Sequence, residues 1–387
     1  MISAPGFLAA CASRGLRFFS GTPCSYLTPL INAAIDDPAL LFRDATNEGD
    51  AVAMAAGAYV ATGRPGVVMF QNSGLGNAVN ALTSLSFPFR IPTLVIVTHR
   101  GQPGGPPDEP QHELMGQITT TLLDTLRIPW EPFPAAPEAI APALDRTQAR
   151  FRDCSLPYAL VLPHGIVADH PLRPAPERAP PGERRLVFGE SLPLAPALRP
   201  SRAQALAALI AARSPEDVVI ATTGYTGREL YTLADTDNHL YLVGSMGSAS
   251  AFALGLALHQ PARRIWVADG DGAVLMRMGN LASIGAFRPR NLFHLLLDNE
   301  VHDSTGGQAT VSRHVAFGAI AGACGYAQAC GTDSLAEFAR LAAAHTTESG
   351  PTLVQLRIRP GALPQLGRPK ITPAAAKERL MRHLGAG

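Results

Sequence analysis

Short apolar segments of strand length alternate with alanine-rich segments of helical length along this chain of 387 residues. Apolar strands separated by helices pair in parallel and are buried on both faces, so the alternation predicts an α/β fold with doubly wound parallel sheets. In the first half, the expected strands are residues 17–20, 40–42, 66–70, 93–98 and 158–162. The clearest helical segments between them are residues 50–61 and 76–84.

The second half repeats this alternation, which predicts a second doubly wound parallel sheet. Its expected strands are residues 217–221, 239–243, 264–268, 292–297 and 351–358. Its expected helices are residues 203–212, 248–259, 273–286 and 335–345, with a last helix at 373–384.

A proline-rich stretch separates the two halves. Eight prolines fall within thirty residues, at Pro171, Pro174, Pro176, Pro180, Pro181, Pro193, Pro196 and Pro200. Proline has no amide donor and disrupts helices and central strands, so this stretch suits an extended spacer. We therefore predict a first domain at residues 1–170, a linker at 171–200 and a second domain at 201–387.

Composition limits the partners that the chain can have. There are 32 lysines and arginines against 31 aspartates and glutamates, with no long basic run, which argues against a nucleic-acid partner bound by bulk charge. No apolar stretch reaches membrane-spanning length and the first residues do not resemble a signal peptide, so we expect a cytoplasmic protein without a membrane partner. The five irregularly spaced cysteines argue against a disulfide framework or a zinc cluster. A charged fraction of only 16% is compatible with a homo-oligomer.

Oxygen ligands follow two expected strands of the second half. Asp271 comes directly after one strand, and Asn299 with Asp298 before it comes after the next. The carboxyl ends of parallel strands meet at the edge where open α/β sheets bind ligands. Carboxylate and amide oxygens suit Mg²⁺, and nearby glycines let a diphosphate approach the backbone. Taken alone, the same residues are explained by ordinary turns.

The spacing of this pair resembles the motif of thiamine diphosphate enzymes, in which an Asp within Gly-Asp-Gly is followed about 28 residues later by an Asn. The resemblance implies Mg²⁺ held by Asp271, Asn299 and the backbone carbonyl of Val301. The diphosphate would lie against the residues flanking this aspartate, which are Gly270, Gly272 and Ala273.

The first half carries further features similar to this family. Glu48 precedes the small-residue helix GDAVAMAAGAYVATG, and the loop QNSGLGNAVNAL, which contains Gly74, is similar to a cofactor-facing loop. In the second half, Gly244, Ser245 and Met246 stand where the family has an apolar wedge under the bent cofactor. Taken alone, Met246 is explained as a core methionine.

The resemblance extends over nearly the whole chain and is finest to the phosphonopyruvate-decarboxylating branch of the 2-keto acid decarboxylases. It is carried by NEGDAVAMAAG, QNSGLGNAVNALTSL, the loop RGQPG to DEPQH, and DNEVHDSTGGQATVS. It implies a pyrimidine-binding first domain, a diphosphate-binding second domain and the conversion of 3-phosphonopyruvate to phosphonoacetaldehyde and CO₂ in phosphonate biosynthesis. Sulfopyruvate decarboxylase is the alternative, although a single fused chain favours the phosphono enzyme. A bilobal small-molecule-binding protein without catalysis is an alternative of another class.

Roles for individual residues follow from the resemblance. Glu48 would promote deprotonation of the thiazolium carbon, because a carboxyl buried beside apolar groups can hold and pass a proton. By position alone it could instead be a helix-terminal glutamate stabilised by the helix dipole. Asp108, His112 and His302 are the ionisable groups expected to supply the final proton, or else they are ordinary loop residues.

The phosphonate and the assembly complete these expectations. Ser304, Thr305 and Gln308 lie in a glycine-containing loop that could present donors to an anion, and Arg100 and Arg313 could add charge. A flexible loop with surface arginines is the alternative. The resemblance also implies a homodimer whose active site lies between subunits, since Glu48 and Asp271 must reach the same cofactor.

Overall fold

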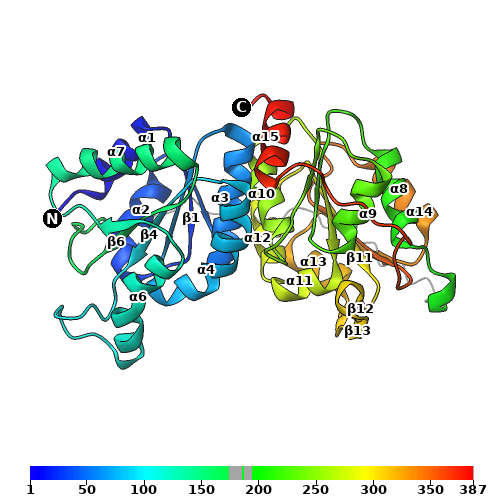
Figure 1. Ribbon diagram of the computed structural model, residues 1–387, viewed down its shortest axis with the longest axis horizontal. Helices are drawn as coiled ribbons and strands as arrows, with labels where there is room; N and C mark the ends of the chain where they lie inside the picture. Colours follow the sequence, from blue (N-terminus) through cyan, green and yellow to red (C-terminus); the bar gives the residue numbers. More distant parts are fainter. Residues whose placement is uncertain (174–184, 187–193, 387) are drawn as a thin grey trace. The chain divides into compact units, whose positions relative to one another are not determined.

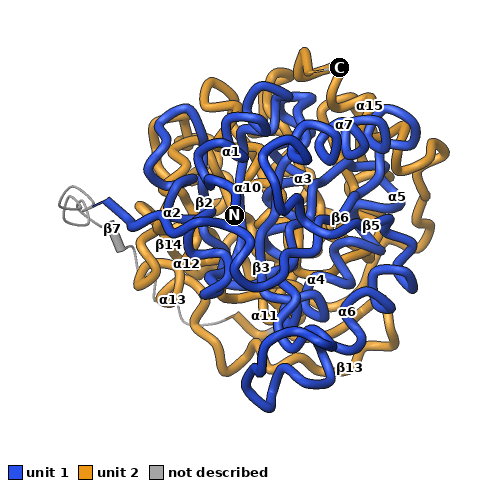
Figure 2. The backbone as a smooth tube through the Cα atoms, turned by 90° about the vertical axis from the view of Figure 1, so that its left-hand side faces the viewer, with its two compact units in different colours: residues 1–178 blue, residues 179–387 orange. Residues whose placement is uncertain are grey.

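The computed structural model describes residues 1–173, 185–186 and 194–386, and contacts divide the chain into two compact units, residues 1–178 and 179–387 (Figures 1 and 2). Most of the predicted linker at 171–200 lies outside the described residues. None of the helices in the described parts of the chain is long and apolar enough to cross a membrane.

Unit 1 is built on a six-stranded parallel sheet with the order β2-β1-β3-β4-β6-β5. Its strands are β1 (Phe18–Gly21), β2 (Leu41–Asp44), β3 (Gly66–Phe70), β4 (Thr93–Thr98), β5 (Trp130–Pro132) and β6 (Tyr158–Leu162). The five predicted strands are therefore confirmed to within one or two residues. β5 was not predicted, because three residues that include a glutamate and a proline at the sheet edge leave no apolar run.

Seven helices accompany this sheet. They are α1 (Ala4–Ser13), α2 (Thr28–Asp36), α3 (Glu48–Thr62), α4 (Leu75–Ala81), α5 (Phe87–Phe89), α6 (Glu113–Thr125) and α7 (Pro137–Cys154) among the described residues. The central helix α3 begins after Asn47, whose side chain accepts a hydrogen bond from the Gly49 amide, and ends at Gly63 with a positive φ of 70°. Nearly every residue of α3 is buried, which its small side chains allow.

Unit 2 holds a seven-stranded parallel sheet with the order β7-β14-β15-β11-β10-β8-β9. Its strands are β7 (Arg185–Leu186), β8 (Val218–Ala221), β9 (His239–Tyr241), β10 (Ile265–Gly270), β11 (Leu292–Asp298), β14 (Gln328–Thr332) and β15 (Thr352–Arg357). The five predicted strands are confirmed here too. β14 was not predicted, because its sequence QACGT has neither an apolar run nor alternation.

The helices of unit 2 include one correction. They are α8 (Arg202–Ala212), α9 (Tyr225–Leu233), α10 (Ala249–His259), α11 (Asp271–Met276), α12 (Asn280–Phe287), α13 (Phe317–Cys324), α14 (Leu335–Ala344) and α15 (Pro373–Leu384). The single helix predicted at 273–286 is wrong. The backbone leaves helical geometry at Arg277, with φ −138° and ψ 45°, and a turn through Gly279 separates α11 from α12.

Parallel pairing gathers the polar strand ends at one edge of this sheet. β10 ends at Gly270, opposite Leu297 of β11, so Asp271 and the residues after β11 leave the sheet side by side. A two-stranded hairpin of β12 (Val301–His302) and β13 (Gln308–Ala309) follows directly (Figure 1). The β8–α9 loop opens at the same edge, because β8 pairs in parallel with β10.

Candidate functional site

A cavity at the carboxyl edge of the unit 2 sheet brings together most of the predicted site residues of the second half. Those that line it are Met246, Gly270, Asp271, Gly272, Ala273, Asn299, Val301, His302 and Ser304. Gly244, Ser245, Thr305 and Gln308 are not among its lining residues. Residues that are far apart in sequence therefore share one site, as the edge of a parallel sheet requires.

Asp271 is a buried carboxylate within this cavity. The Thr310 hydroxyl donates a hydrogen bond of 2.5 Å to its Oδ2 atom. Burial raises the pKa of the Asp271 carboxyl, the nearby Asp298 charge adds to this, and hydrogen bonds from Thr310 and Ser312 oppose it. A cation beside Asp271 would stabilise the ionised form that burial disfavours.

Both carboxylate oxygens of Asp298, which precedes the predicted ligand Asn299, accept hydrogen bonds from other side chains. The Ser312 hydroxyl donates to its Oδ1 atom at 2.8 Å, and Gln355 Nε2 donates to Oδ2 at 2.7 Å. This carboxylate therefore anchors the end of β11 to β15 and to the segment after β13.

Asn299 is oriented by a partly buried ion pair. Its Nδ2 atom donates a hydrogen bond of 2.6 Å to Asp303 Oδ2, and this same oxygen accepts a 2.6 Å bond from Arg202 Nη2. The backbone amide of Gly361 also donates to Asp303, at 3.2 Å. With the amide nitrogen held in this way, Asn299 Oδ1, which accepts only a long 3.4 Å bond from the Val301 amide, keeps a lone pair for a ligand.

These groups form an oxygen donor set. Asp271 supplies a carboxylate, Asn299 an amide oxygen and Val301 a backbone carbonyl, which is the hard ligand type that Mg²⁺ prefers. Among the described residues there is no group of three or more His, Cys, Asp or Glu side chains suited to a metal. The predicted site needs none, because only one of its three ligands is a carboxylate.

Gly272 lies under two other predicted residues. A Cβ atom at Gly272 would come within 2.6 Å of His302 Cε1 and 3.2 Å of Met246 Cε, so a larger residue would displace these side chains. Just before Met246, Ser245 is buried with a positive φ of 53°, and its hydroxyl lies 2.7 Å from that of Ser248. Left-handed backbone at a non-glycine residue is uncommon and concentrates at functional sites.

The hairpin loop contributes less than the sequence suggested. Ser304 lines the cavity. The Thr305 hydroxyl instead donates a hydrogen bond of 3.1 Å to Gln308 Oε1, so these two side chains bind each other. Gln308 is exposed. Arg313 lines a separate cavity beside Asp298 rather than the predicted site.

In unit 1, Glu48 has a polar environment. Its Oε1 atom accepts a hydrogen bond of 3.0 Å from the Thr22 hydroxyl, and Oε2 accepts one of 2.8 Å from Asn77 Nδ2. The expectation of apolar neighbours is therefore corrected by these two donors. The Glu48 carboxylate packs directly against the backbone of Gly74. A Cβ atom at this position would overlap Glu48 Oε1, so glycine is needed for the carboxylate to keep this position.

Asp108 and Arg100 form a closed pair in unit 1. Arg100 donates from Nε at 3.0 Å and from Nη2 at 2.5 Å, and the Gly101 amide and Tyr26 hydroxyl also donate to Asp108. The Arg100 guanidinium holds the pKa of the Asp108 carboxyl well below its usual range. This geometry favours a permanent carboxylate over a proton donor, and it neutralises the charge of Arg100.

His112 is a different kind of candidate. Its side chain is buried, and its Nδ1 atom has no hydrogen-bond partner among the described residues. A buried ring nitrogen without a partner is costly, so this imidazole remains available to a group beyond those described.

Sequence reasoning missed several groups at these edges. Residues 222–226, the loop TTGYT after β8, also line the cavity of unit 2. Thr22 follows β1 and Asn77 follows β3 and its loop, while Thr310 follows β13. Polar residues just after predicted parallel strands share one edge of the sheet, which is the rule that was applied to Asp271. The same rule could have found residues 222–226, Thr22 and Asn77. Thr310 had no such signal.

Two family models match the chain. One is described as "Thiamine pyrophosphate enzyme, N-terminal TPP binding domain" and matches residues 4–121. The other is described as "Thiamine pyrophosphate enzyme, C-terminal TPP binding domain" and matches residues 222–356. Each match falls within one of the two compact units.

Curated relatives span nearly the whole chain. Phosphonopyruvate decarboxylase of Streptomyces viridochromogenes is 48% identical over 379 residues, covering 98% of this chain and 94% of the relative. The enzyme of the same name from Streptomyces hygroscopicus is 48% identical over 375 residues, covering 96% and 92%. Sulfopyruvate decarboxylase of Methanosarcina acetivorans is 28% identical over 333 residues, covering 80% and 79%.

The last of these relatives corrects one expectation. It aligns with both halves of this chain, so a single fused chain does not by itself favour the phosphono enzyme.

Among solved structures, benzoylformate decarboxylase from Polynucleobacter necessarius has a TM-score of 0.73 at 13% identity, covering 94% of this chain and 100% of that chain. This likeness is one of fold.

The close approach of Gly74 to Glu48 makes a prediction about stability. In Gly74→Ala, the added methyl must displace the Glu48 carboxylate from Thr22 and Asn77, although φ −75° at Gly74 would otherwise accept alanine. We expect the free energy of unfolding to fall by about 1–3 kcal/mol in urea denaturation.

Gly76→Ala is the matched control, two residues away. A Cβ atom there has no neighbour within 4 Å, and Gly76 lies in α4, so alanine should stabilise the protein by about 0.5–1 kcal/mol. Equal effects of the two substitutions would contradict the proposed role of the Gly74 contact.

Proposed function

The chain belongs to the thiamine pyrophosphate enzymes, and from this we propose that it decarboxylates 3-phosphonopyruvate to phosphonoacetaldehyde and CO₂ in phosphonate biosynthesis. The observation that carries the proposal is 48% identity to two phosphonopyruvate decarboxylases over nearly the full chain, against 28% to the single-chain sulfopyruvate decarboxylase. Five free cysteines suit a reducing compartment, and we assign the protein to the cytoplasm.

Unit 2 would be the diphosphate-binding domain and unit 1 the pyrimidine-binding domain. Mg²⁺ would be held by Asp271, Asn299 and the Val301 carbonyl, with the diphosphate against Gly270 to Ala273. Support comes from the donor set, from the burial of the Asp271 carboxyl, which disfavours its ionised form, and from the fixed amide of Asn299. Bound thiamine diphosphate supplies the electron sink that accepts the electron pair when CO₂ leaves.

The protein groups then bind, orient and move protons. Glu48, held by Thr22 and Asn77, would exchange a proton with the aminopyrimidine ring of the cofactor. Met246, which lies against Gly272, would contact the bound cofactor. His302 lines the unit 2 cavity, so its imidazole could deliver the proton that replaces the lost carboxyl group. His112 is the second candidate for that proton, because its Nδ1 atom lacks a partner.

We expect purified protein with thiamine diphosphate and Mg²⁺ to form phosphonoacetaldehyde from 3-phosphonopyruvate, followed by phosphorus NMR. Sulfopyruvate is the matched substrate, since only the anionic head group differs. We expect kcat/KM to be at least about tenfold higher for 3-phosphonopyruvate, because the dianionic head offers stronger charge-assisted hydrogen bonds. A preference for sulfopyruvate, or no product from either, would overturn the assignment.

The support of Asn299 by Asp303 makes a prediction about metal binding. Asp303→Ala removes the acceptor that orients Asn299 while leaving all three proposed ligands in place. We expect affinity for Mn²⁺, measured by electron paramagnetic resonance with thiamine diphosphate present, to fall about tenfold to a hundredfold. Asp237→Ala, an exposed charge in the same unit, should leave it unchanged. Unaltered metal affinity in Asp303→Ala would show that Asn299 needs no such support.

We also propose a homodimer with the active site shared between subunits, because Glu48 and Asp271 belong to different units and must serve one cofactor. Glu48→Gln removes the proton-exchanging carboxyl, and Asp271→Ala removes the metal ligand. Each variant alone should therefore lose orders of magnitude in turnover.

Mixing these two inactive variants tests the shared site. About half of the randomly assembled dimers are mixed, and one of their two sites carries both intact residues, so activity should recover to about a quarter of wild type. Subunit exchange is verified by mass spectrometry of differently tagged chains. A mixture that exchanges subunits and stays inactive would mean that each site is built within one chain.

A further inference from the structure

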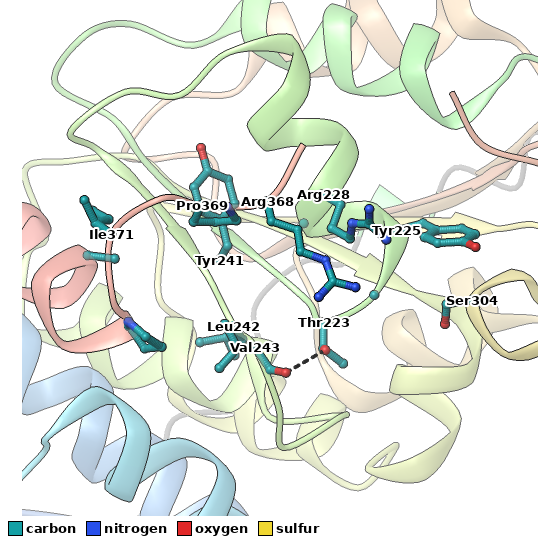
Figure 3. A pocket seen from close by; sticks show the side chains of 14 residues that line it. Thr223, Tyr225, Arg228, Tyr241, Leu242, Val243, Ser304, Arg368, Pro369 and Ile371 are labelled. Atoms are coloured by element: carbon teal, nitrogen blue, oxygen red, sulfur yellow. Dashed lines mark hydrogen bonds between the residues drawn. The ribbon is translucent and has the colours of Figure 1, made fainter. Parts of the chain in front are cut away.

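A second cavity of unit 2 adjoins the candidate site. It has a volume of about 520 Å³ and shares Thr223, Gly224, Tyr225 and Ser304 with the cavity that contains Asp271 (Figure 3). Its other walls come from α9, from the end of β9, and from α15 with the segment that leads into it. This space is ample for a three-carbon keto acid beside the cofactor site.

Two arginines line this cavity, Arg228 and Arg368, and only Arg228 has its guanidinium bonded to backbone carbonyls. Figure 3 shows the Arg368 side chain reaching into the cavity toward Thr223. No carboxylate is among the residues that line the cavity, and no ion pair or hydrogen bond joins the Arg368 guanidinium to a described residue. Its charge is therefore available to a ligand.

The backbone that carries Arg368 is fixed by α9. Arg228 donates from Nη2 to the Leu366 carbonyl at 3.0 Å and from Nε to the Gly367 carbonyl at 3.3 Å. The Gly367 amide in turn donates to Thr232 Oγ1 at 2.9 Å. A Cβ atom at Gly367 would lie 2.9 Å from the Tyr231 ring, so the segment can approach the helix this closely only with glycine there.

Three other arginines near the candidate residues already have partners, and Arg313 lines a different cavity. Arg100 is neutralised by Asp108, and Arg202 is paired with Asp303. Arg228 is engaged with the backbone just before Arg368. A phosphonate is best recognised by a guanidinium that can donate two parallel hydrogen bonds.

We propose that Arg368 binds the phosphonate group of the substrate, in a pocket formed by the β8–α9 loop and the segment before α15. This rests on the proposed function and deepens it. Ser304 lines this pocket as well as the cavity of Asp271, whereas the Thr305 hydroxyl donates to the Gln308 side chain. The chemistry recognised is a tetrahedral oxyanion, and its two possible sources are the substrate phosphonate and the cofactor diphosphate.

Arg368→Gln tests the assignment, with Arg359→Gln as the matched control. Arg359 lies on the same segment, is exposed, and lines neither of the two cavities. We expect KM for 3-phosphonopyruvate to rise at least about tenfold in Arg368→Gln and to stay unchanged in Arg359→Gln. Arg368→Lys should recover part of the loss, since it restores the charge without the planar fork.

Two binding measurements separate the sources of the oxyanion. Calorimetry should give thiamine diphosphate affinities within about twofold of wild type in Arg368→Gln, while methylphosphonate should bind the Mg²⁺-loaded holoenzyme at least about tenfold more weakly than it binds wild type. Weakened cofactor binding with unchanged methylphosphonate binding would assign Arg368 to the diphosphate and overturn the proposal. Unchanged KM and unchanged methylphosphonate binding would also overturn it.

Failure of the proposed function would look different. Wild-type holoenzyme would then leave 3-phosphonopyruvate intact, whatever residue stands at position 368. Methylphosphonate binding would still report on Arg368 in that case. Its loss in Arg368→Gln would support an oxyanion pocket, and its retention would exclude one.

Discussion

The burial of the Asp271 carboxylate is the constraint around which the edge of the unit 2 sheet is organised. A buried charge without compensation costs several kcal/mol, of the order that a whole domain has to spare. Thr310 offsets part of this cost through a hydrogen bond, and Ser312 links the same region to Asp298. The segment after β13 is thereby fixed against β10 and β11, and the hairpin that carries Val301 and His302 is held beside Asp271.

In unit 1, the corresponding constraint is the packing of the Glu48 side chain against the loop that contains Gly74. The N-cap at Asn47 starts α3 so that Glu48 is its first residue, and small residues let that helix be buried on nearly all sides. Gly74 then allows the Glu48 carboxylate to cross the backbone, where Thr22 and Asn77 donate to its two oxygens. Because both oxygens have protein donors, the orientation of the carboxyl group is fixed by this chain itself.

Sequence reasoning succeeded where one physical signal dominates locally. Apolar runs identified the central strands of both sheets, and α15 was predicted with its observed ends because proline and glycine bracket it. β5 and β14 were not predicted, because they are strands through pairing with β6 and β15 and not through their own composition. The clustering of Asp271, Asn299 and Val301 was predictable from parallel topology. The orientation of Asn299 was not, because the Asp303 side chain that orients it is itself held by Arg202, 101 positions away.

The arginines show this limit most clearly. By sequence, Arg100 and Arg313 were the natural cations for an anionic substrate, since both lie in loops that resemble family motifs. Whether an arginine can bind a ligand depends on which carboxylate already holds it, and that is decided by tertiary contacts. Asp108 lies only eight residues from Arg100 and pairs with it. Arg368 extends from a segment whose backbone carbonyls are held by α9, and no carboxylate of the described residues pairs with its guanidinium. The positive and negative charges of this chain nearly balance. An arginine in a cavity without a carboxylate partner is therefore a more specific guide to an anion site than net charge or loop position.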